Sequence, residues 1–73
     1  MKTKVILNEW DGDRSSDIGG FEIEVIAGGE TATIRCKSYN TPKERTDALA
    51  SARKRAEKVA DDIGVEVEED LYD

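Results

Sequence analysis

Two adjacent glycines, Gly28 and Gly29, separate two segments of alternating polarity and constrain the fold more than any other feature of the chain. Both central residues of a type I′ turn need a positive φ, which glycine adopts without steric cost. Residues 20–27 and 31–39 alternate apolar and polar side chains, which is typical of strands that bury one face. The sequence therefore predicts a β-hairpin with a two-residue turn.

The length of this turn also predicts which residues of the hairpin face each other. A slip by one residue would move every apolar side chain to the wrong face, so the turn and the alternation must agree on one register. Here they do. The expected pairs are Phe21–Cys36, Ile23–Ile34 and Val25–Ala32 on one face, and Glu22–Arg35 and Glu24–Thr33 on the other.

One long helix is expected after the hairpin. Thr41 is a favourable N-cap, Pro42 suits the first helical position and Gly64 suits the residue that follows a helix, so the helix should span residues 42–63. Apolar side chains recur within it at spacings of three and four residues, which predicts one buried stripe. The expected stripe consists of Leu49, Ala52, Ala56, Val59 and Ile63, flanked by Ala48 and Ala60.

Two further strands are expected near the ends of the chain. Residues 4–10 contain a run of Val, Ile and Leu, and residues 65–69 alternate Val and Glu, as does an edge strand protected by its own charge. The sequence thus predicts a single small α+β domain over residues 1–73. Its three-stranded antiparallel sheet, with a short fourth strand at one edge, has one long helix packed on one face, in the order β-β-β-α-β. Residues 70–73 are expected to form a loose acidic tail.

Charge is segregated along the chain, which has 17 acidic and 11 basic side chains and a net charge of −6. Residues 1–34 carry a net charge of −4, residues 35–58 carry +5, and residues 59–73 carry −7. Such a layout does not set a fold, but it creates a field that keeps the protein soluble and steers charged partners.

The residue types offer little for catalysis. The chain has no histidine, and its single cysteine, Cys36, is expected on the inward face of its strand as a small buried side chain rather than a nucleophile. We therefore expect no enzymatic activity and no cofactor. A lone thiol without a signal sequence or an apolar membrane span indicates a cytoplasmic protein. The small core is compatible with a monomer or a homodimer.

The segment of residues 11–22 has the ligand spacing of a calcium-binding loop. It resembles the twelve-residue loop of EF-hands, in which side-chain oxygens recur at alternate positions and a glutamate closes the loop. The candidate ligands are Asp11, Asp13, Ser15, Asp17 and Glu22. Ser16 stands where such loops need a glycine, and strands rather than helices are expected on both sides. Calcium binding is accordingly the third hypothesis for this chain.

The basic middle of the chain is compatible with nucleic-acid binding. Contacts to phosphates dominate such affinity, and a sheet with one helix can present them. The candidate residues are Arg35, Lys37, Arg53, Lys54 and Lys58. The negative charge of the whole chain and the acidic residues interspersed along the helix argue against this role. Nucleic-acid binding is therefore the alternative to the main hypothesis.

The main hypothesis is that acidic residues bind a basic surface of a protein partner. Carboxylates spaced along a rigid edge can imitate a row of phosphates, and long-range attraction then speeds association. Two of them, Asp61 and Asp62, fall in the last helical turn, where the helix dipole disfavours anions. The candidate residues are Asp61, Asp62, Glu66, Glu68, Glu69, Asp70, Asp17, Glu22 and Glu24.

A stretch of twelve residues, 17–28, resembles a stretch in one group of small phage-encoded anti-CRISPR proteins that act on type I-F surveillance complexes. The shared elements are an Asp shortly before Gly-Gly-Phe-Glu and a closing Val-x-Ala-Gly. This resemblance implies an acidic, non-enzymatic phage or mobile-element inhibitor that occupies a DNA-binding groove of a host protein. Of the acidic candidates, Asp17 and Glu22 belong to these shared elements, and the long helix has no counterpart in that group.

Overall fold

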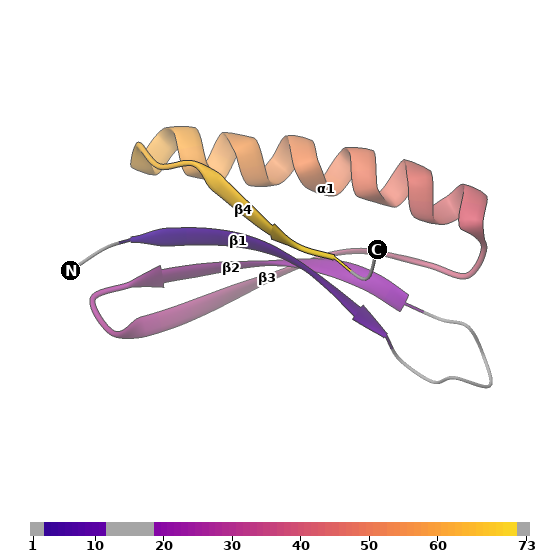
Figure 1. Ribbon diagram of the computed structural model, residues 1–73, viewed down its shortest axis with the longest axis horizontal. Helices are drawn as coiled ribbons and strands as arrows, with labels where there is room; N and C mark the ends of the chain where they lie inside the picture. Colours follow the sequence, from indigo (N-terminus) through magenta and orange to yellow (C-terminus); the bar gives the residue numbers. More distant parts are fainter. Residues whose placement is uncertain (1–2, 12–18, 72–73) are drawn as a thin grey trace.

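The structure is a computed structural model that describes residues 3–11 and 19–71. One helix lies along one face of a sheet (Figure 1). The elements follow the predicted order β-β-β-α-β. They are β1 (Lys4–Asp11), β2 (Gly19–Ala27), β3 (Glu30–Tyr39), α1 (Pro42–Ile63) and β4 (Val67–Asp70). The predicted α+β architecture is thereby confirmed.

The sheet has four strands in the order β3-β2-β1-β4. β1 and β2 pair antiparallel, as do β2 and β3, whereas β4 pairs with β1 in parallel. The sheet is therefore mixed. β4 begins at Val67, two residues later than the alternation of Val and Glu predicts, and ends at Asp70, which we had expected in the acidic tail. Strand pairing with β1 extends order to that residue.

The hairpin has the predicted turn and, over most of its length, the predicted register. Gly28 and Gly29 have φ of 60° and 82°. Ile23 faces Ile34 and Glu22 faces Arg35, but the next ladder pair joins Gly20 to Ser38.

Because β3 has one extra residue at this point, the expected pair of Phe21 with Cys36 does not form, and Cys36 and Lys37 together stand opposite Phe21. Such a bulge reverses the faces of the residues beyond it. Tyr39 consequently lies on the helix-covered face, where its ring is 5.4 Å from that of Phe21.

The helix begins and ends where its capping residues predict. Thr41 has an extended backbone, and its hydroxyl accepts a hydrogen bond from the Glu44 N–H at 3.1 Å. Gly64 is left-handed, with φ of 90°, and donates its N–H to the carbonyl of Ala60 at 2.7 Å. Both ends of α1 thus satisfy backbone groups that a helix leaves unpaired.

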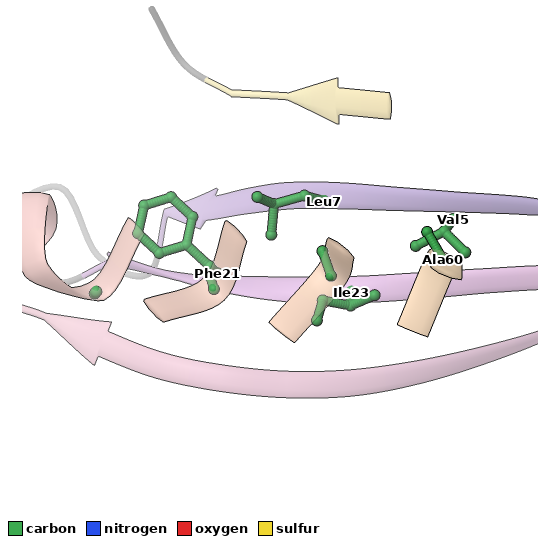
Figure 2. Close-up of a cluster of buried hydrophobic side chains, with 8 residues drawn as sticks. Val5, Leu7, Phe21, Ile23 and Ala60 are labelled. Carbon is green, nitrogen blue, oxygen red and sulfur yellow. The ribbon is translucent and has the colours of Figure 1, made fainter. Parts of the chain in front are cut away.

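The core lies between α1 and the sheet. Its largest buried side chains come from β1 and β2 and point toward the helix (Figure 2); they are Val5, Leu7, Phe21 and Ile23. The helix contributes only alanines at spacings of four, namely Ala48, Ala52, Ala56 and Ala60.

The predicted apolar stripe of the helix is therefore wrong in its centre. Leu49 and Val59 are half-buried on the flanks, and Ile63 is 43% exposed. Small side chains at the centre let the helix backbone approach the sheet closely, so the larger residues lie beside the contact instead of within it.

The alanine contact leads to a prediction about packing. We expect Ala52→Leu to lower the free energy of unfolding by about 1–3 kcal/mol, because three extra carbons must enter a filled space. Ala50 is exposed on the same helix. Ala50→Leu should change stability by less than about 0.5 kcal/mol. Urea denaturation followed by circular dichroism measures both, and equal effects would contradict this account of the core.

Candidate functional site

Four carboxylates lie on the face of the sheet opposite the helix, which we call the open face. Strand pairing places Glu24 and Glu68 on either side of Ile6, and Glu22 and Asp70 on either side of Asn8. These positions alternate with the buried ones, so all four side chains lie away from α1. From the spacings of strands and residues, the four Cα atoms form a grid of about 10 Å by about 7 Å.

The neighbours of these carboxylates on the open face are mixed. Asn8 donates a side-chain hydrogen bond to Glu24, and Arg35 stands opposite Glu22. Lys4 lies farther along, opposite Ile26. The two cations leave a net negative charge on this face of the described sheet.

Trp10 lies on the open face too, on the same side of β1 as Ile6 and Asn8. A Cβ on Gly20 would lie 2.6 Å from the Trp10 ring, so only glycine allows the indole to rest on β2. Trp10 is half-buried in this position. A partly exposed indole beside charged side chains is typical of binding surfaces.

A groove between α1 and β4 holds the second group of acidic residues. Its volume is about 540 Å³. The lining residues are Arg53, Glu57, Ala60, Asp61, Val65, Glu66, Val67 and Glu69. Arg53 spans the groove and binds Glu69 through two hydrogen bonds of 2.7 and 3.1 Å. This contact lowers the pKa of the Glu69 carboxyl, and the hydrogen bond to Glu69 raises the pKa of Arg53.

The structure thus divides the predicted acidic set. Glu22, Glu24, Glu68 and Asp70 lie on the open face, whereas Asp61, Glu66 and Glu69 line the groove. β4 contributes to both groups, so one strand edge is acidic on its two sides. Asp62 is exposed on the helix outside the groove, and the last turn of α1 contains no basic residue to offset it or Asp61. Asp17 lies outside the described residues.

The basic candidates do not form one surface. Arg35 lies on the open face beside Glu22, while Lys54 and Lys58 are exposed on the helix that covers the opposite face. Arg53 is paired with Glu69. Lys37 is exposed at the bulge of β3. A nucleic-acid backbone would have to contact both layers of the protein to reach them all.

Most of the calcium-loop residues lie outside the described part of the chain, including Asp13, Ser15 and Asp17. Glu22, the residue expected to close the loop, is in β2 opposite Arg35. Asp11 ends β1 opposite Gly19. Within residues 3–11 and 19–71, no three acidic or cysteine side chains are grouped closely enough to hold a metal ion.

Cys36 is half-buried and packs against the core, on the face on which we expected it. Burial raises the pKa of its thiol, and the Arg55 guanidinium opposes that shift to a smaller extent. A raised pKa leaves little thiolate near neutral pH, so the environment of Cys36 does not favour nucleophilic chemistry.

Sequence reasoning missed a buried ion pair between Glu9 of β1 and Arg45 of α1. Glu9 is on the helix-covered face, and its side chain is only 1% exposed. Arg45 donates two hydrogen bonds to this carboxylate at 2.7 and 2.8 Å, and the Tyr39 hydroxyl donates another. The Arg45 guanidinium also lies 5.8 Å from the centre of the Phe21 ring. The overlooked signal was the position of Glu9, which follows Val5 and Leu7 at alternate positions of β1 and therefore points to the same face.

Comparisons with known proteins identify no matching protein-family model, no matching curated protein and no matching solved structure for this chain. The helix of the described residues is not long and apolar enough to cross a membrane.

The buried pair yields a prediction about stability. Arg45→Ala should lower the free energy of unfolding by about 3 kcal/mol, because the Glu9 carboxylate would stay buried without the guanidinium. Arg53→Ala should cost much less, since the Arg53–Glu69 pair is exposed to solvent. Thermal and urea unfolding of the two variants test this contrast, which would be refuted by similar losses.

Tyr39 should ionise only at very high pH. Burial, followed by its hydrogen bond to Glu9, raises the pKa of Tyr39 to about 12. Because the unfolded tyrosine ionises near pH 10, stability should be intact below that pH and fall as the pH rises toward 12. Ultraviolet titration of a Tyr72→Phe variant follows Tyr39 alone. A midpoint near pH 10 in the folded protein would contradict the described contacts.

Proposed function

We propose that this protein is a non-catalytic binding protein that engages a basic surface of a protein partner through the open face of its sheet. The observation that carries the proposal is the grid formed by Glu22, Glu24, Glu68 and Asp70 on a face that no described element covers. Strand pairing holds the four backbone positions rigidly. The partner therefore meets a preorganised array of negative charge, which lowers the entropic cost of binding.

Apolar groups on the same face allow such an interface to form apolar contacts in addition to ionic ones. Ile6 lies between Glu24 and Glu68, and Trp10 lies on the same side of β1. Contacts of exposed charges with a partner chiefly set the rate of association, whereas apolar and aromatic side chains contribute more to the lifetime of the complex. A surface with both kinds of group suits a lasting inhibitory complex.

The favoured partner is a host protein that itself binds nucleic acid. Such proteins have basic grooves, and rows of carboxylates can compete there with phosphates. The implied role is that of a phage or mobile-element inhibitor that occupies the groove as a mimic of DNA. It is supported by the acidic face and by the resemblance of residues 17–28 to anti-CRISPR proteins.

Neutralising the open face tests this function. Glu22→Gln with Glu24→Gln should weaken capture of the partner from a bacterial lysate about tenfold at low salt, because attraction between exposed charges is lost. Captured proteins should be released by salt and by competing duplex DNA.

A matched variant with the same charge carries Asp47→Asn and Asp62→Asn, two exposed residues of the helix. It should capture the partner as the unaltered protein does. The proposal is wrong if both double variants behave alike, or if the protein itself retains duplex oligonucleotides at low salt, as a nucleic-acid-binding protein would.

A further inference from the structure

The outer edge of β4 is free of any described strand. β4 is the last strand in the sheet order and pairs with β1 on one side only. The unpaired backbone groups of such an edge can accept another strand from a second polypeptide. Its sequence, Val-Glu-Glu-Asp, disfavours pairing with a second copy of this chain, because like charges would then stand opposite each other. The same charges favour a basic strand.

The groove beside this edge fits long basic side chains. Its lining includes the apolar residues Ala60, Val65 and Val67, with Asp61 and Glu66 among the acidic ones. Lysine and arginine side chains can lay their methylene groups on an apolar surface while the charged end reaches a carboxylate. Within the molecule, the Arg53 guanidinium already binds the carboxylate of Glu69 in the same groove.

We propose that an extended segment of the partner, rich in lysine or arginine, adds to the free edge of β4. Its backbone pairs with β4, and every second side chain enters the groove toward Asp61 and Glu66. The alternate side chains reach Glu68 and Asp70 on the open face. This inference rests on the proposed function only in that the partner is basic, and it identifies the part of the partner that binds at β4.

A defined peptide tests the inference without the natural partner. The probe is an eight-residue peptide of alternating lysine and threonine, blocked at both ends and titrated into isotopically labelled protein. The amide signals of residues 65–70 should shift most. A peptide of equal charge with N-methylated threonines should bind about tenfold more weakly, because strand addition needs its backbone donors. Equal affinity of the two peptides would overturn the proposal.

Two adjacent aspartates provide the matched control. Asp61 lines the groove and Asp62 does not, yet both lie in the last turn of α1, where loss of a negative charge does not threaten the helix. Asp61→Asn should weaken peptide binding several-fold, and Asp62→Asn should leave it unchanged. Equal effects would mean that the peptide responds to net charge alone, and would reject the groove as its site.

The peptide experiment can succeed or fail independently of the lysate experiment that tests the proposed function. Glu22 and Glu24 lie on β2, two strands from β4, so their neutralisation should leave binding of the peptide at β4 intact. If the peptide does not bind but capture from the lysate still depends on Glu22 and Glu24, strand addition is wrong and the proposed function stands. If the peptide binds but capture from the lysate does not depend on Glu22 and Glu24, strand addition stands and the proposed function is wrong.

Discussion

The close approach of one helix to one face of a small sheet is the constraint on which this structure depends. Four alanines, Ala48, Ala52, Ala56 and Ala60, form the contact surface of the helix. Because they are small, the bulk of the core comes from side chains of β1 and β2. Within residues 3–11 and 19–71, α1 is the one helix and covers one face of the sheet, so no described element covers the opposite face. Its polar character follows from that arrangement.

Two ion pairs of different kinds join the helix to the sheet. Arg45 meets the buried Glu9 near the start of α1, and Arg53 meets the exposed Glu69 on β4. The buried pair is costly to break, whereas the exposed pair contributes little stability. The Arg53–Glu69 pair matters more as an indication of how a foreign guanidinium would bind beside β4.

The acidic residues of the last segment acquire two different surroundings through β4. Successive residues of a strand point to opposite faces, so Glu68 and Glu69 are directed to the open face and to the groove, respectively. The proposed partner therefore meets negative charge on both sides of one free edge. The acidic residues that are clustered at the end of the sequence thus form negative surfaces on both sides of β4, and the proposed function depends on this arrangement.

Local features of the sequence determined each element of the fold. The Gly28–Gly29 turn set the hairpin, and Thr41 and Gly64 set the ends of the helix, because positive φ values and helix caps depend on a few neighbouring residues. The acidic character of residues 59–73 was equally evident.

Only the tertiary structure decided which side chains that are far apart in the sequence lie on the same face of the sheet. The extra residue in β3 turns Tyr39 inward toward Glu9, and neither the bulge nor the identity of the residues that pair with Glu9 has a local signal in the sequence. The same holds for the parallel pairing of β4 with β1, which divides the acidic candidates between groove and open face. These features depend on contacts between residues far apart in the chain, where packing and hydrogen bonding outweigh local preference.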